Sequence, residues 1–408
     1  MNGLNLHFPG DSSYVFELMS RERGRQMQHV ELIASENFVS DNVLAALGSV
    51  FTNKYAEGYP QQRDSGNTGR YYGGCQFVDE LERYCCTQWQ RVFDTNYHVN
   101  VQLHSGSNAN LAAYQAIERA RHRSTLSVLS LSLDNGGHLT HGSKVNFSGR
   151  NYTFHHYGLT PDGFIDYDAM QELADKYHPD VILAGASAYS REIDFYQFRI
   201  AADRVGATLM VDMAHIAGLV ATGLHCSPFG MADVITTTTH KTLRGARGGL
   251  IFCIPSMAKQ VDSAVFPGTQ GGALMHVVAA KAVTACEALD PQFKVYMQNV
   301  VRNASAMATR FTMLGDKVVT GGTDNHMFLL DLSGTPVTGL ALQNALERMD
   351  ITLNKNAIPG DKRSPKETSG VRIGTPAMTS KGWTARDFCD IADAIHGVIQ
   401  GLMTETHV

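Results

Sequence analysis

The chain has 408 residues, of which 43% are hydrophobic and 18% charged, and its formal net charge is −5 at pH 7. This composition is typical of a globular protein with room for two domains, and the negative charge argues against a nucleic-acid partner. No apolar run reaches the roughly 20 residues that a membrane span needs, so we expect no membrane association either.

The first predicted element is a helix over residues 14–28, which could pack as an arm on a partner subunit. A helical pattern of small and apolar residues follows over residues 109–121. From there apolar runs that predict strands alternate with helical patterns. The predicted strands are 126–133, 181–184, 208–211, 234–237 and 250–254, and helices at 167–176 and 198–205 lie between some of them. This alternation predicts an α/β fold with a mostly parallel sheet and helices on both faces.

After about residue 285 the pattern changes and predicts a smaller α+β domain. Helices are predicted at 293–314, 340–349 and 384–403, the last with Thr384 as a possible N-cap, and strands at 327–332, 351–354 and 370–373. The predicted organisation is therefore an N-terminal arm (1–30), a large domain (31–285) and a small C-terminal domain (286–408).

Cysteine and histidine usage bears on compartment and metals. The seven cysteines form no C-x-x-C pair, and their number is odd. Together with a start that lacks the pattern of a secretory signal, this favours a reducing compartment, and we expect the cytoplasm. The 17 histidines include no His-Glu-x-x-His motif and no Cys/His cluster, so we expect no metal site.

Polar residues that could hold a cofactor follow two of the predicted strands. Asp212 and His215 come after strand 208–211, and His240 and Lys241 come after strand 234–237. In parallel sheets, ligands bind beyond the carboxyl ends of the strands. Pyridoxal phosphate needs a lysine for its Schiff base and a carboxylate that keeps its pyridine nitrogen protonated. Alone, Lys241 is more simply a surface lysine just past a strand, but the wider set of residues favours the cofactor.

Two loops could bind a phosphate. Ser105, Gly106 and Ser107 precede the helix at 109–121, and hydroxyls and free N–H groups at a helix N-terminus bind anions. An ordinary helix cap is the alternative for one serine of this loop. The Gly-rich segment 267–272 could add further N–H groups, although such turns are common.

Three other residues are candidates for binding or catalysis, and two of them also have a simpler structural explanation. His138, in the loop 136–142, could stack on a planar ring or be an exposed loop histidine. Arg372 is a lone charge in an apolar strand, so it could bind a substrate carboxylate bidentately or form an internal salt bridge. Glu57 lies in one of two Gly-rich loops that also hold tyrosines, and is a candidate general acid/base.

Seven motifs in one order resemble the serine hydroxymethyltransferases, which are pyridoxal-phosphate enzymes of fold type I. They are ELIASEN (31–37), TNKYAEGYP (52–60), HLTHG (138–142), SAYS (187–190), TTHKTL (238–243), GTDNH (322–326) and NKN (354–356). The resemblance implies a large domain with a seven-stranded, mostly parallel sheet and a smaller C-terminal α+β domain. It also implies an obligate homodimer with shared active sites. The implied reaction converts L-serine and tetrahydrofolate to glycine and 5,10-methylenetetrahydrofolate.

The resemblance further implies how the cofactor is held. Lys241 matches the Schiff-base lysine, Asp212 the partner of the pyridine nitrogen and His138 the stacking histidine. The phosphate site comprises one loop from each of two subunits and a tyrosine, with matching residues Ser105, Gly106, Ser107, Tyr55, Gly271 and Gly272. Positions around the cofactor's 3′-oxygen and phosphate match Ser187, His215 and His240, and a motif position near the lysine matches Arg247.

Substrate and folate residues are implied in the same way. Arg372 matches the arginine that binds the substrate carboxylate, with Ser35 beside it, and Glu57 and Tyr72 match the pair that handles protons and the hydroxymethyl group. The implied folate pocket consists of Glu57, Tyr71, Leu133, Gly137, Leu139 and Asn356.

One departure from the family pattern keeps other functions open. Residues 64–70 (DSGNTGR) lengthen the loop between Glu57 and Tyr72, beside the expected folate entrance. The alternatives are an α-methylserine hydroxymethyltransferase or a folate-independent β-hydroxy-amino-acid aldolase or transaldolase, although Glu57 and Asn356 argue against loss of folate. A non-catalytic homologue that binds a partner or RNA is disfavoured because Lys241, Asp212 and Arg372 are all present.

Overall fold

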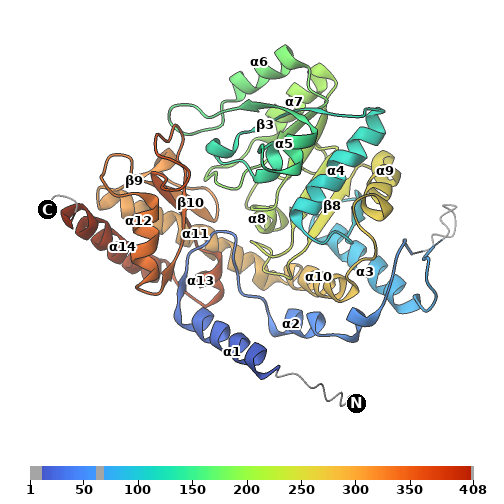
Figure 1. The fold of residues 1–408 in the computed structure, drawn as a ribbon, viewed down its shortest axis with the longest axis horizontal. Helices are drawn as coiled ribbons and strands as arrows, with labels where there is room; N and C mark the ends of the chain where they lie inside the picture. The colour runs from blue at the N-terminus through green and yellow to red at the C-terminus, as the bar shows by residue number, and fades with distance from the viewer. Residues whose placement is uncertain (1–11, 61–68, 406–408) are drawn as a thin grey trace.

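The structure is a computed structural model that describes residues 12–60 and 69–405 (Figure 1). Its largest sheet has seven strands in the order β2-β8-β7-β6-β5-β3-β4. Five strands run parallel: β3 (Ser127–Leu131), β4 (Thr153–Tyr157), β5 (Val181–Ala184), β6 (Thr208–Asp212) and β7 (Val234–Thr238). At one edge β8 (Gly249–Cys253) is antiparallel to β7, and β2 (His98–Asn100) is antiparallel to β8. The predicted α/β fold with a mostly parallel sheet is confirmed.

Helices cover both faces of this sheet because its strands are apolar on both sides. Along β5, Val181 and Leu183 pack in one core, and Ile182 and Ala184 pack in the other. The helices α4 (Gly106–Arg121) and α9 (Ala258–Ser263) contribute to the first core. The helices of the second core are α3 (Gln76–Val92), α6 (Tyr167–Tyr177), α7 (Phe195–Val205), α8 (Ala217–Thr222) and α10 (Met275–Ala288).

The C-terminal elements build a separate, antiparallel sheet with the order β12-β13-β10-β9. Its strands are β9 (Lys317–Val318), β10 (Met327–Asp331), β12 (Asn354–Asn356) and β13 (Gly370–Gly374). An apolar core joins this sheet to the helices α11 (Pro291–Met313), α12 (Gly339–Glu347) and α14 (Ala385–Glu405). In Figure 1 the orange and red elements of this part lie to one side of the large sheet, with α11 between them.

The N-terminal segment contacts this C-terminal part. After α1 (Ser13–Gln28), β1 (Val30–Glu31) pairs in parallel with β11 (Ile351–Thr352), and α2 (Asp41–Leu47) follows. Farther along, the N–H of Gly374 donates to Leu32 O, and a Cβ on Gly374 would lie 2.3 Å from Ala34 Cα. The chain next to Ser35 is therefore fixed against the end of β13. The division into three parts at residues 30 and 285 stays a prediction, and residues 1–11 and 406–408 lie outside the described residues.

Several element ends differ from the prediction for local reasons. The helix expected from residue 109 begins at Gly106, because Ser105 caps it. The strand expected at 126–133 ends at Leu131, and Leu133–Asn135 form a 3-10 turn that leads into Gly136 at φ 99°. Helix α14 begins at Ala385, so Thr384 stands at the predicted N-cap position, where the side chain of Asp387 accepts hydrogen bonds from both its N–H and its hydroxyl. No helix within the described ranges is long and apolar enough to cross a bilayer.

Candidate active site

A cavity of about 170 Å³ lies beyond the carboxyl ends of the parallel strands. Each of four strands sends a loop to it: His138 follows β3, Ser187 follows β5, His215 follows β6 and Lys241 follows β7. The predicted residues that line it are Ser105, Gly106, Ser107, His138, Ser187, Asp212, His215, His240, Lys241 and Arg247. The structure thus brings together residues that are up to 142 positions apart in the sequence.

Asp212 is held by donors on both carboxylate oxygens. Its Oδ2 accepts from Asn110 Nδ2 (2.9 Å) and contacts His141 Nε2 (3.2 Å), and its Oδ1 accepts from Ala214 N–H (3.0 Å). Burial opposes ionisation of Asp212, but the hydrogen bond and charge of His141 hold its pKa below the usual range. Asp212 is therefore ionised at neutral pH, as a partner for a protonated pyridine nitrogen must be. Sequence reasoning missed Asn110 and His141, although both lie in segments already singled out.

Lys241 lines the same cavity, and the pKa of its amine is lowered. Burial lowers its pKa to about 8; the charges of Arg372 and Arg247 act in the same direction, and Asp212 opposes them. At neutral pH the amine is consequently still mostly protonated, but its unprotonated fraction is far larger than that of an ordinary lysine. An unprotonated lysine amine is the form that condenses with an aldehyde.

The loop at Ser105 forms the N-terminus of the 16-residue α4. The Ser105 hydroxyl accepts from Asn108 N–H (3.1 Å), so Ser105 is a helix cap as well as a cavity residue. A Cβ on Gly106 would lie 2.5 Å from Thr238 Cγ2, so only glycine lets this loop approach the end of β7 so closely. Free N–H groups at this helix end can bind a phosphate.

Two residues that line the cavity each have a buried polar atom without a hydrogen-bond partner among the described residues. These atoms are Thr238 Oγ1 and His240 Nδ1. Buried polar atoms are normally satisfied, so such a pair beside an anion-binding helix end favours a polar ligand. Together with Asp212 and Lys241, these residues fit pyridoxal phosphate.

His138 and His240 are neutral at the cavity wall. Burial lowers the pKa of His138 to about 4 and that of His240 to about 3. His138 Nδ1 lies 2.7 Å from Thr140 Oγ1, which fixes the ring at the cavity wall, so His138 is not the exposed loop histidine of the alternative. His215 Nδ1 lies 3.2 Å from Nε2 of His326, a residue to which sequence reasoning gave no role although it lies in the GTDNH motif.

Arg372 projects from β13 toward Ser187. Its Nη1 donates to Ser187 O (2.7 Å) and its Nε to Asn354 Oδ1 (3.2 Å). Among the described residues no carboxylate forms an ion pair with it, so the predicted alternative of an internal salt bridge has no support. Burial lowers the pKa of Arg372 to about 10, which leaves it charged at neutral pH. A substrate carboxylate would supply the missing counter-charge.

A second cavity of about 740 Å³ adjoins the first and shares His138 and Ser187 with it. Arg372 lines this cavity. So do four of the residues predicted for folate: Leu133, Gly137, Leu139 and Asn356. The residue predicted to bind the substrate's carboxylate and the four residues predicted to bind folate therefore line one cavity.

Six of the remaining candidates form a third group, which lines neither cavity, whereas Ser35 lies next to Ala34 at the end of β13 and also lines neither. The rings of Tyr55 and Tyr72 are 4.8 Å apart and those of Tyr71 and Tyr72 are 5.2 Å apart. A Cβ on Gly271 would lie 3.2 Å from Glu57 Oε1, and one on Gly272 would lie 3.6 Å from Tyr55 Cε1. The three tyrosines are 58%, 81% and 42% exposed for Tyr55, Tyr71 and Tyr72 respectively. Such an exposed aromatic cluster is typical of a surface that meets another molecule.

The backbone of this group is held from one side. Arg70 Nη1 donates to Ala56 O (3.0 Å) and Gly58 O (2.6 Å), and Tyr71 N–H donates to Glu57 O (3.0 Å). The buried Arg70 also pairs with Asp79 and Glu82. Of the predicted insertion, residues 64–68 lie outside the described residues.

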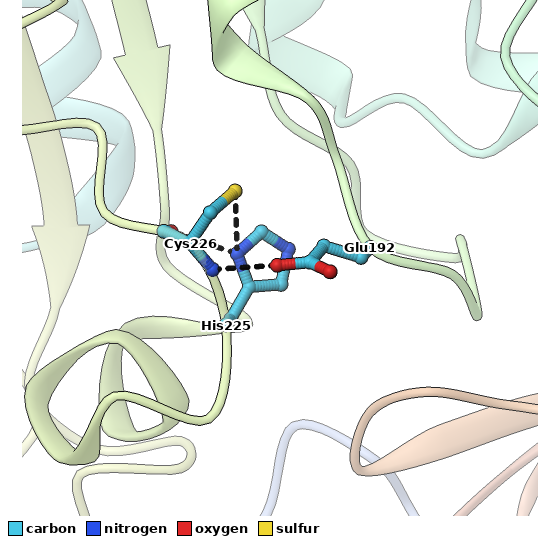
Figure 2. A group of neighbouring side chains, drawn as sticks. All are labelled: Glu192, His225 and Cys226. Atoms are coloured by element: carbon cyan, nitrogen blue, oxygen red, sulfur yellow. Dashed lines mark hydrogen bonds between the residues drawn. The ribbon is translucent and has the colours of Figure 1, made fainter.

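The structure also assembles Glu192, His225 and Cys226, a set of side chains that could in principle bind a metal (Figure 2). The N–H of Ile193 donates to His225 Nε2 (3.1 Å), so the proton of the neutral ring lies on Nδ1, which donates to Cys226 O (2.9 Å). Neither ring nitrogen then has a free lone pair. The Cys226 thiol donates to Ile193 O, and Glu192 accepts from Cys226 N–H. These hydrogen bonds join two loops and assign the group a structural role.

One comparison with known proteins bears on these sites. A family model described as serine hydroxymethyltransferase matches residues 10–395. The matched span includes the whole seven-stranded sheet, both cavities and the group around Glu57.

Proposed function

Because the chain belongs to the serine hydroxymethyltransferase family, whose enzymes use pyridoxal phosphate, we propose that it catalyses the family's reversible reaction. L-Serine and tetrahydrofolate give glycine and 5,10-methylenetetrahydrofolate. The observation that carries the proposal is the shared wall of the two cavities. It puts Lys241 and Asp212 next to Arg372 and to the folate candidates.

The residues of the first cavity would hold the cofactor. Pyridoxal phosphate, when bound, supplies an electron sink for the bond that breaks at the amino acid's Cα. The Ser105–Gly106–Ser107 loop binds its phosphate, and ionised Asp212 keeps a proton on the pyridine nitrogen. Neutral His138 would pack against the cofactor ring, and Lys241 Nζ would be the amine that holds its aldehyde.

Arg372 and Glu57 would act on the substrates. The guanidinium of Arg372, with Ser35 as the second candidate, would bind the amino-acid carboxylate and so fix the orientation of the substrate's Cα. Glu57 and Tyr72 hold or move a proton at the β-hydroxyl or at the N5 and N10 atoms of folate. Holding both substrates in one site supplies much of the remaining acceleration by orientation.

We propose further that the active enzyme is a homodimer whose sites are shared. The support is that Tyr55, Glu57, Tyr72, Gly271 and Gly272 do not line the Lys241 cavity of their own chain and instead form a group with an exposed aromatic surface. In a C2 dimer such a surface can complete the site of the other chain. The cytoplasm, inferred from cysteine usage, stays the proposed location; all seven thiols are free.

The alternative is a specialised relative: an α-methylserine hydroxymethyltransferase or a folate-independent β-hydroxy-amino-acid aldolase or transaldolase. The observation that favours it is the lengthened chain between Glu57 and Arg70, next to the proposed acid/base. The four folate candidates around the second cavity favour the main proposal.

Glycine formation from L-serine by the purified holoenzyme, with and without tetrahydrofolate, tests the main proposal. We expect turnover that depends strongly on folate. Folate-independent cleavage, or activity only on an α-methyl or β-substituted serine, would contradict it and favour the specialised relative. Absence of any pyridoxal-phosphate binding would instead identify a non-catalytic homologue.

A further inference from the structure

Lys281 is a buried cation to which the proposed mechanism gives no role. It lies on α10 and is 1% exposed. Its ammonium donates to three backbone carbonyls, Val101 O (2.7 Å), Leu103 O (2.8 Å) and Gly249 O (2.9 Å). All three N–H donors of the ammonium are thus used on the backbone, and no described carboxylate forms an ion pair with it.

The three carbonyls belong to the two chain segments that lead to the cofactor cavity. Residues 101–103 follow the end of β2, where the chain leaves the sheet on its way to Ser105. Their buried carbonyls therefore need donors outside the ladder. Lys281 supplies them at residues 101 and 103, and Gln270 Nε2 supplies one at Gln102 O (2.7 Å). The third carbonyl acceptor, Gly249, begins β8 just after Arg247 of the cavity wall.

These two segments meet directly behind Ser105. Gly249 N–H donates to Leu103 O (3.2 Å), and a Cβ on Gly249 would lie 2.3 Å from Ser105 O. A Cβ on Gly248 would lie 2.4 Å from Lys281 Cε, so the lysine stem occupies the space beside that glycine. The ammonium therefore sits at the junction on which the Ser105 loop rests. A shift of this junction would move the N–H groups and hydroxyls of the loop.

We propose that Lys281 is a positioning residue for the phosphate site: it fixes residues 101–105 against 247–249 and so sets the geometry of the Ser105–Gly106–Ser107 anion site. This inference rests on the proposed function, because it takes that loop as the site of the cofactor's phosphate. Burial lowers the pKa of Lys281 to about 8, with the thiols of Cys85 and Cys86 and the carboxyl of Glu82 opposing. The residue is protonated at neutral pH and adds positive charge behind an anion site.

The test compares two ligands that differ only in the phosphate. Apoenzymes of the wild type and Lys281→Met are titrated with pyridoxal phosphate and with pyridoxal, and binding is followed by protein fluorescence. Methionine keeps the length of the side chain but removes its charge and donors. We expect the Kd of pyridoxal phosphate to rise roughly 10- to 100-fold, as for lost hydrogen bonds to a charged group, while the Kd of pyridoxal changes little. Equal losses for both ligands, or no loss, would overturn the proposal.

Two matched variants separate positioning from stability. Lys281→Arg keeps the charge and the donors, and it should restore part of the preference for the phosphorylated ligand. Phe388→Leu weakens the core around α14, far from this loop in sequence, and should leave the ratio of the two Kd values unchanged. If Lys281→Met does not fold, as judged by circular dichroism, Gln270→Leu removes the neighbouring donor and should show a smaller loss confined to pyridoxal phosphate; a ratio equal to wild type in that variant counts against the proposal. A wild-type apoenzyme that binds neither ligand would refute the proposed function itself.

Discussion

Burial by itself would raise the pKa of Asp212 and lower that of Lys241, two of the ionisable residues that line the first cavity. It favours the neutral form of both, yet Asp212 stays ionised because Asn110, His141 and the N–H of Ala214 donate to it. Lys241 has no such group of acceptors, and its pKa falls to about 8. One fixed negative charge and one amine that readily loses its proton therefore face each other across the cavity.

The basicity of Lys241 gives a pH prediction. Only the unprotonated amine attaches to the aldehyde, so the rate at which apoenzyme captures pyridoxal phosphate should rise with pH around a midpoint of about 8. Stopped-flow absorbance across pH 6 to 10 measures this rate. Lys241→Ala should still bind the cofactor without the covalent link and turn over poorly. A midpoint above 10, or near-wild-type turnover by the alanine variant, would contradict the assignment.

Arg372 gives a prediction about substrate affinity. Arg372→Ala removes a charged, bidentate partner of the carboxylate, so serine binding should weaken by about 1.5–3 kcal/mol, roughly 10- to 100-fold in KM. Arg372→Lys keeps the charge but not the planar fork, and should recover only part of this loss. Steady-state kinetics at saturating folate measures both. An unchanged serine KM in the alanine variant would remove Arg372 from the substrate site.

At the scale of elements, the sequence predicts those strands and helices whose local pattern is complete. The strands β5, β6 and β7 are buried on both faces and appear as short apolar runs. The strand β2 has only three residues, and β4 carries two histidines at the edge of the sheet, so neither shows a strand pattern. Helix α10 is apolar nearly all round and offers no amphipathic stripe, which is why the sequence predicts no helix there.

In the candidate site, too, some residues could be predicted from the sequence and others could not. Motifs and strand ends predict the residues around Lys241, because most of them lie at or just after the end of a parallel strand. Contacts between helices and strands that are far apart in the sequence, such as those of Asn110 with Asp212 and of Lys281 with Gly249, carry no local pattern. The sequence alone could not indicate them.

The contact between the N-terminal segment and β13 gives a prediction at this scale. Gly374→Ala would drive a Cβ into Ala34 Cα, at 2.3 Å, so the 31–35 segment must move or β13 must shift. We expect a loss of stability of about 1–3 kcal/mol, the usual cost of overpacking, and weaker serine binding because Ser35 moves. Gly397→Ala in α14, where the added methyl meets nothing within 4 Å, should instead stabilise by about 0.5–1 kcal/mol. Thermal unfolding of both variants checks this; equal melting temperatures would contradict the contact.

For the whole molecule, the separation of Glu57 from Lys241 predicts complementation between defective chains. Lys241→Ala and Glu57→Gln dimers should each be nearly inactive. If sites are shared, a hybrid dimer carries one intact site, so random exchange of equal amounts should recover about a quarter of wild-type activity. Unfolding and refolding the mixed variants, followed by the serine assay, measures the recovery. No recovery above the parent variants, with dimers present by size-exclusion chromatography, would mean that each chain builds its site alone.

The antiparallel bridge between Gly58 and Arg70 has a consequence for how this protein can diverge. The bridge, the Arg70 bonds to the two carbonyls that flank Glu57 and the bond from Tyr71 N–H to Glu57 O close a loop at its base. Closing a longer loop costs little, about 0.6 kcal/mol of chain entropy for each doubling of its length. Lineages can therefore gain or lose residues between positions 58 and 70 while Glu57 and Tyr71 keep their places. A change in this loop can then alter which substrates the proposed site accepts without a change in the position of Glu57.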